Sequence, residues 1–221
     1  MAAVYRMVFI DLDGTTLTTE KTMTPRTRAV LDRLERVGIS VVIATGRAIY
    51  SVRELFHDVP FRGPVITLNG AVVFRGLWAP VWHMETIDTG TLREALQALE
   101  REPRIINILL ESPDGYFVRR FDEEVRETFT EYRKIEPRLL APEAVREAVV
   151  TNMLVRPDDG HKDFVHDMLQ EMLGHSVSFA KTSWTWLEGL KAGVSKATAM
   201  RVVAERASLL PACFQCRRFR P

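Results

Sequence analysis

The chain has 221 residues, 46% of them hydrophobic, which is enough for one core or for one core with a smaller appended domain. Its 30 Lys and Arg residues nearly balance its 29 Asp and Glu residues, so no overall field favours nucleic acid or an anionic membrane. The start of the chain lacks a signal-peptide pattern, and no apolar run is long enough to span a bilayer. We therefore expect a soluble cytoplasmic protein that acts on a small polar molecule.

Three apolar runs in the first third of the chain have the pattern of buried parallel strands. Residues 4–10, 39–46 and 64–70 each lead from apolar residues into polar or glycine-containing sequence. Helical patterns separate these runs, and the links are short. This alternation predicts a doubly wound parallel sheet, whose ligands bind beyond the carboxyl ends of its strands.

Two helices are expected between these strands. The first has Thr24 as its cap, Pro25 in its first turn and Gly38 at its end. One face of this helix is predicted to carry Val30, Leu31, Leu34 and Val37. The second helix is marked by Ile49, Val52, Leu55 and Phe56.

The pattern changes after residue 70, where short strands and helices alternate as in an α+β module. Strands are expected at 71–74, 81–84, 105–111, 115–120 and 149–155 and as a pair within 176–188, and helices at 89–100, 122–133 and 160–173. A helix after Ser195 returns to the first domain. We therefore assign residues 1–80 and 187–210 to an α/β core, 81–186 to an inserted α+β cap and 211–221 to an atypical tail.

The atypical tail contains both cysteines of the chain, Cys213 and Cys216, together with three arginines. A zinc site would need a second cysteine pair or histidines at ligand spacing, and none follows. We assign no metal or redox function to the tail.

Two carboxylates, Asp11 and Asp13, follow the first strand directly in the sequence Asp-Leu-Asp-Gly-Thr. Two such charges repel by roughly 1 to 4 kcal/mol at contact distance, so the pair favours a bound cation or one shared proton. The alternative is a strand-end turn with an Asp cap. The position after a buried strand favours the functional interpretation.

Polar groups also follow the second and third strands. The segment Thr45-Gly46-Arg47 offers a hydroxyl and a backbone amide that suit the oxygens of a phosphoryl group, and Asn69 follows the third strand. Turn chemistry alone would also explain both segments. Lys196, at the start of the returning helix, would by itself be interpreted as an exposed residue.

The segments DLDGTTL, ATGR, LNGA and GVSK occur in that order, and together they resemble the haloacid dehalogenase superfamily in its Cof-type branch. The resemblance implies a Rossmann-like α/β core with an inserted cap and a magnesium-dependent phosphatase for a small phosphorylated metabolite. It makes Asp11 the nucleophile that forms an aspartyl-phosphate, Asp13 the proton-transfer group, and both of them ligands of Mg²⁺. Phosphate-binding roles fall to Thr45, Gly46, Arg47, Asn69 and Lys196, with Lys191 as a less favoured alternative to Lys196.

The sequence departs from this family near its end, since no Asp or Glu follows Glu205 where the family has an acidic, magnesium-binding loop. We therefore expect weak magnesium binding and impaired activity, and the change in composition suggests a frameshift, a truncation or a divergent terminus. The rival interpretations are a non-catalytic binder of phosphorylated ligands, a defective fragment or, less favoured, a phosphomutase. An absent strand beside residues 5–10 would leave a sheet edge open to self-association.

Overall fold

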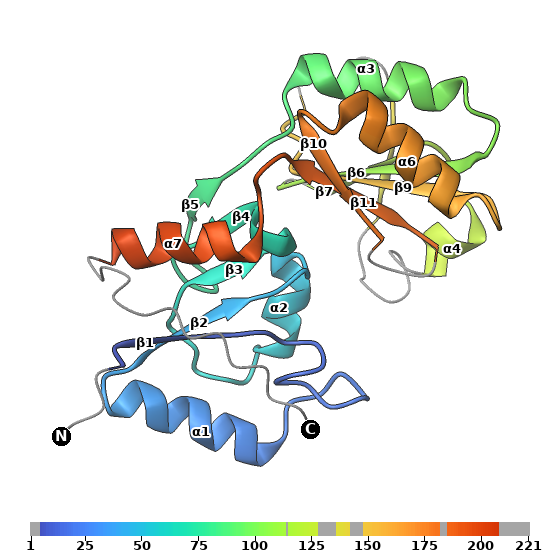
Figure 1. The fold of residues 1–221 in the computed structure, drawn as a ribbon. Coiled ribbons are helices and arrows are strands. Elements are labelled where there is room, and N and C mark those ends of the chain that lie inside the picture. The colour runs from blue at the N-terminus through green and yellow to red at the C-terminus, as the bar shows by residue number, and fades with distance from the viewer. Residues whose placement is uncertain (1–4, 114, 128–135, 142–147, 182–184, 208–221) are drawn as a thin grey trace. The chain divides into compact units, whose positions relative to one another are not determined.

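The computed structural model describes residues 5–113, 115–127, 136–141, 148–181 and 185–207. The chain divides into two compact units (Figure 1). We call Met1–Met84 with Val194–Pro221 the core unit and Glu85–Gly193 the cap unit. The atypical tail, with Cys213 and Cys216, lies outside the described residues. Within the described part of the chain, no helix is both long and apolar enough to cross a membrane.

The core unit contains one five-stranded sheet in the order β1-β2-β3-β4-β5. Its strands are β1 (Met7–Ile10), β2 (Ser40–Ala44), β3 (Val65–Thr67), β4 (Val72–Phe74) and β5 (Val81–Met84). The first three strands are parallel, and β4 and β5 are antiparallel to their neighbours. The expected α/β fold class is confirmed by this sheet and its helices.

The helices of the core unit are α1 (Pro25–Arg36), α2 (Ile49–Leu55), α7 (Lys196–Arg206) and the short 3₁₀ turn η1 (Leu68–Gly70). The Thr24 side chain accepts the Thr27 amide and caps α1, as the sequence predicts. The predicted apolar face of α1 is only partly right. Leu31 is buried, but Val30 and Val37 remain 50% and 64% exposed. The buried face of α1 is therefore narrower than the apolar face predicted from the sequence.

The core of this unit forms where α7 packs on the sheet. Ala199 and Val203 of α7 contact a cluster of buried residues that contains Val42, Ala44, Ile66 and Val73. Strand β1 is an exception to the predicted burial, because all four of its residues are only half-buried. Among the described strands β1 pairs with β2 alone, so it lies at the edge of the sheet.

The cap unit contains a second sheet, in the order β10-β11-β9-β6-β7-β8. Its elements are α3 (Thr89–Glu100), β6 (Ile105–Ser112), β7 (Gly115–Val118), α4 (Glu123–Val125), β8 (Arg138–Leu139), β9 (Asn152–Pro157), α6 (Lys162–Leu173), β10 (Val177–Ala180) and β11 (Leu187–Lys191). The helix expected at 122–133 is described only in its first part, as α4.

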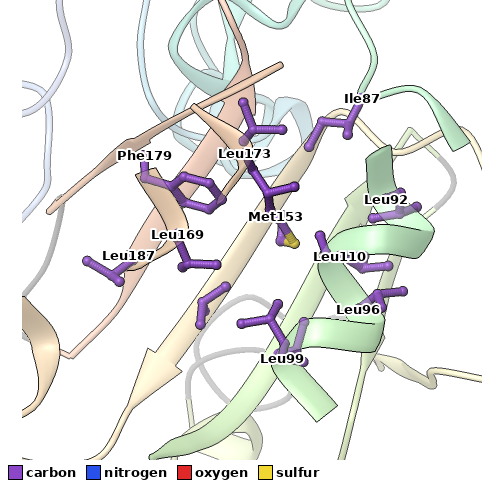
Figure 2. Packing of buried hydrophobic residues seen from close by; sticks show 14 of the residues in the cluster. Ile87, Leu92, Leu96, Leu99, Leu110, Met153, Leu169, Leu173, Phe179 and Leu187 are labelled. Atoms are coloured by element: carbon purple, nitrogen blue, oxygen red, sulfur yellow. The ribbon is translucent and has the colours of Figure 1, made fainter. Parts of the chain in front are cut away.

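Leucines on one side of α3 and α6 pack against one face of the cap sheet (Figure 2). Leu92, Leu96 and Leu99 come from α3, and Leu169 and Leu173 come from α6. The spacing of three or four residues places each set on one face of its helix, and this face packs against the sheet.

The unit boundaries lie a few residues beyond the expected ones. Residues 81–84, which the sequence analysis assigned to the cap, form β5 and pair with β4 in the core sheet. Residues 187–191, which it assigned to the core, form β11 and pair with β9 and β10 in the cap sheet. Strand pairing, which single-sequence patterns do not specify, sets these boundaries.

Candidate active site

The candidate site lies at the carboxyl ends of β1, β2 and β3, which are parallel and therefore end at one edge of the sheet. Asp11 follows β1 and Thr45 follows β2. Two backbone hydrogen bonds join the turn η1 to the segment after β2: the Leu68 amide donates to the Arg47 carbonyl at 3.2 Å, and the Asn69 amide to the Thr45 carbonyl at 3.1 Å.

Asp11 is held by its own loop and by one lysine. The Leu12 amide donates to Asp11 Oδ1 at 2.8 Å, and Lys196 Nζ donates to Asp11 Oδ2 at 2.8 Å. The loop is fixed because Leu12 is fully buried and its carbonyl accepts amides from the residues that follow. The Asp11 side chain remains 42% exposed, so a ligand can still reach its carboxylate oxygens.

Asp13 is held by two other cations. Arg47 donates through Nε to Oδ2 at 2.7 Å and through Nη2 to Oδ1 at 2.8 Å, a bidentate contact that fixes the carboxylate plane. Lys21 Nζ adds a third bond to Oδ1 at 2.9 Å. The hydrogen bonds from Arg47 are the largest cause of a pKa of Asp13 well below its usual range; burial opposes them, and the hydrogen bond from Lys21 and the charges of both cations add to the lowering. Asp13 is therefore ionised in this arrangement.

Three further candidate residues, Thr45, Gly46 and Asn69, pack against one another beside the two carboxylates. Thr45 is fully buried, and its hydroxyl accepts the Arg47 amide at 3.1 Å. A Cβ atom at Gly46 would lie 3.0 Å from Asn69 Oδ1, so the Asn69 side chain packs directly over this glycine. The structure brings these three residues together, and their roles as phosphate ligands remain predictions.

Lys196 reaches Asp11 because it is the first residue of α7. Ser195 caps this helix and accepts the Thr198 amide, while the Thr198 hydroxyl accepts the Ser195 amide. Lys191, the alternative lysine, instead pairs with Glu85 in the cap unit at 2.6 Å. Of the two lysines, Lys196 is the one in contact with Asp11.

Lys21 was missed by the sequence analysis. It lies in the exposed turn between β1 and α1, and its φ of 60° is unusual for a residue other than glycine. No motif marks it. The only signal is a cation close in sequence to two carboxylates, which is common on protein surfaces.

The two carboxylates of the site, which are the candidate magnesium ligands, are both paired with cations. Both oxygens of Asp13 are bound by Arg47 or Lys21, and one oxygen of Asp11 is bound by Lys196. Across the described residues, no three His, Cys, Asp or Glu side chains lie together in a metal-binding group. Magnesium is usually held by one or two carboxylates together with waters and substrate phosphate, and here both candidate carboxylates are already paired with cations.

Comparison with known proteins identifies the family. The family model described as haloacid dehalogenase-like hydrolase matches residues 8–211. Phosphatase YwpJ of Bacillus subtilis is 35% identical over 97 residues, which are 44% of this chain and 34% of YwpJ. The 5-amino-6-(5-phospho-D-ribitylamino)uracil phosphatase YitU of Bacillus subtilis is 22% identical over 207 residues, which are 90% of this chain and 74% of YitU.

The fold is shared with solved structures. The structure of TM0651 from Thermotoga maritima matches with a TM-score of 0.77 at 23% identity, covering 92% of this chain and 76% of that one. The chain thus spans about a third of YwpJ and about three quarters of YitU and TM0651. Because the family model covers nearly the whole sequence, the chain belongs to the haloacid dehalogenase-like hydrolase family.

Proposed function

We propose that this protein hydrolyses a small phosphate monoester through a covalent phosphoryl intermediate on Asp11. One observation carries the proposal: two carboxylates at the end of β1 are held by separate cations, Asp11 by Lys196 and Asp13 by Arg47. An ionised, partly exposed carboxylate can act as a nucleophile, and a second carboxylate two residues away can move protons.

The proposed reaction has two steps. In the first, an Asp11 oxygen attacks phosphorus, the bond from phosphorus to the ester oxygen breaks, and Asp13 gives a proton to the leaving oxygen. In the second, water attacks phosphorus, Asp13 takes a proton from that water, and the bond between phosphorus and Asp11 breaks. Lys196 offsets negative charge on Asp11 and the transferring group throughout.

The first step requires a change at Asp13. Its contacts with Arg47 and Lys21 lower its pKa, whereas a proton donor must first hold a proton. A phosphate that enters the site offers Arg47 another bidentate partner. We propose that Arg47 exchanges Asp13 for the substrate phosphate, which agrees with the phosphate-binding role expected from the sequence.

The proposed substrate is a small phosphorylated metabolite. The relative YitU is named for a phosphorylated ribitylaminouracil, a compound of this class. We also propose a requirement for magnesium, as the family resemblance implies, with Asp11 and Asp13 as its protein ligands. When bound, the ion would neutralise charge on the phosphoryl group. Both carboxylates are paired with cations in this structure, so no step above depends on the ion.

The pairing of both carboxylates with cations favours one rival, a protein that binds phosphorylated ligands without turning them over. The test is the hydrolysis of para-nitrophenyl phosphate, with and without magnesium, by the wild type, Asp11→Asn and a control, Asp58→Asn. Asp58 is an exposed carboxylate paired with Arg28 outside the site. We expect turnover in the wild type and the control and none in Asp11→Asn. Phosphate binding without turnover in the wild type would instead support the binder, and phosphate transfer to a sugar would support a mutase.

A further inference from the structure

The turn η1 has an unusual backbone for its sequence. Leu68, Asn69 and Gly70 have φ values of 49°, 51° and 112°. Left-handed conformations cost energy for residues with a Cβ atom, and Leu68 is also buried. Such strain persists where the surrounding structure fixes it, and it is frequent at functional sites.

One side of the turn is fixed to the segment after β2. The Leu68 and Asn69 amides donate to the carbonyls of Arg47 and Thr45, and the Asn69 side chain covers Gly46. These contacts leave the turn little freedom to move relative to the sheet, since β3 precedes it and β4 follows it.

The other side of the turn touches the start of α7. A Cβ atom at Gly70 would lie 2.2 Å from the Ser195 carbonyl oxygen, 2.5 Å from the Ser195 carbonyl carbon and 3.0 Å from the Lys196 nitrogen. All three atoms belong to the backbone, which cannot rotate away as a long side chain would. Glycine at position 70 therefore permits the close approach of α7 to the turn.

We infer that Gly70 is a positioning residue for Lys196. The backbone contact between Gly70 and the start of α7 fixes the distance of Lys196, the first residue of α7, from the sheet. From this position the Lys196 side chain reaches Asp11 at the end of β1. A larger residue at position 70 would push Ser195 and Lys196 away and lengthen the 2.8 Å contact between Lys196 Nζ and Asp11 Oδ2. The catalytic consequence rests on the proposed function, but the positioning itself does not.

The test compares Gly70→Ala with Gly38→Ala. Gly38 also has a positive φ, 79°, but a Cβ atom there meets no atom within 4 Å. Both variants introduce alanine into a left-handed conformation, and only Gly70→Ala meets the backbone of α7. The first readout is the ¹⁵Nζ signal of Lys196, assigned by its loss in Lys196→Met. We expect Gly70→Ala to move this signal to the position of an exposed lysine, and Gly38→Ala to leave it unchanged.

The second readout is kinetic. A displacement of about 1 Å can cost about 100-fold in rate, so we expect Gly70→Ala to lower kcat for para-nitrophenyl phosphate by about that factor. In the Lys196→Met background the same change should cost almost nothing further, because Gly70 acts through the lysine. An unchanged Lys196 signal in folded Gly70→Ala, or independent multiplicative losses of kcat, would overturn the inference.

Two further outcomes are separable. If the wild type shows no turnover but the Lys196 signal shifts in Gly70→Ala, the proposed function fails and the positioning role stands. If Gly70→Ala does not fold, the close approach of Gly70 to α7 is tested in the wild type instead. The inference requires nuclear Overhauser contacts between the Gly70 Hα protons and the Lys196 amide. Their absence would contradict it.

Discussion

Lys196→Met should separate catalysis from stability. The ion pair of Lys196 with Asp11 spans 2.8 Å, but its side chains are 29% and 42% exposed, so water screens much of the attraction. Partly exposed pairs of this kind contribute about 0 to 1 kcal/mol to stability. A group that stabilises developing charge on a transferring phosphoryl is worth far more, about 100- to 1,000-fold in kcat when removed. We therefore expect a large loss of rate with an unfolding free energy changed by less than about 1 kcal/mol.

Lys191→Met is the matched control. Lys191 is 49% exposed and pairs with Glu85 at 2.6 Å, so the Lys191→Met variant loses a similar ion pair, in the cap unit. The assay is kcat for para-nitrophenyl phosphate, with chemical denaturation of both variants. Equal kinetic effects of the two substitutions would refute the assignment of Lys196 to the site. A stability loss in Lys196→Met of several kcal/mol would show that the lysine is structural instead.

Three other predictions follow from the contacts described above. Arg47→Gln should raise the pKa of Asp13 toward its ordinary value, measured by carboxyl NMR titration, whereas the control Arg28→Gln should leave the pKa of Asp13 unchanged. The stability that Arg47 supplies through Asp13 is fully present above the ordinary Asp pKa of about 3.9, and it is lost as the pH falls toward the lower pKa of the folded state. Leu110→Ala, which empties a fully buried position in the cap core, should cost about 2 to 5 kcal/mol in denaturant unfolding, and a loss below about 1 kcal/mol would contradict the packing. Amides of β1 should exchange faster than those of α3, because β1 is an edge strand among those described; strong protection of Val8 and Phe9 would show that another strand covers this edge.

Local signals in the sequence specify much of this fold. The helix at 89–100 has the predicted bounds because Asp88 caps it and its apolar residues repeat at helical spacing. The convergence of Asp11, Thr45 and Asn69 was predictable for a related reason, since parallel strands place their carboxyl ends at one edge of a sheet. Lys196 needed the family resemblance, because a lysine at a helix start has no distinctive local pattern.

Long-range contacts account for what the sequence analysis missed. The apolar sequence of β1 predicted a buried strand, but its residues are only half-buried because β1 lies at the edge of the described sheet, which agrees with the open edge expected beside residues 5–10. The contact between Lys21 and Asp13 depends on a left-handed residue in an irregular turn. Gly70 was part of a predicted turn, but its close approach to Ser195 joins residues 125 positions apart, which no local pattern encodes.

The most direct measurement of the central claim is the location of the phosphoryl group on the protein. The wild type is incubated with para-nitrophenyl phosphate and magnesium, quenched in acid and reduced with borohydride, which converts an aspartyl-phosphate to homoserine, and its peptides are then analysed by mass spectrometry. The account predicts homoserine at position 11 in the wild type and none in Asp11→Asn. Modification at Asp13 or elsewhere, or turnover by Asp11→Asn without any covalent intermediate, would contradict it.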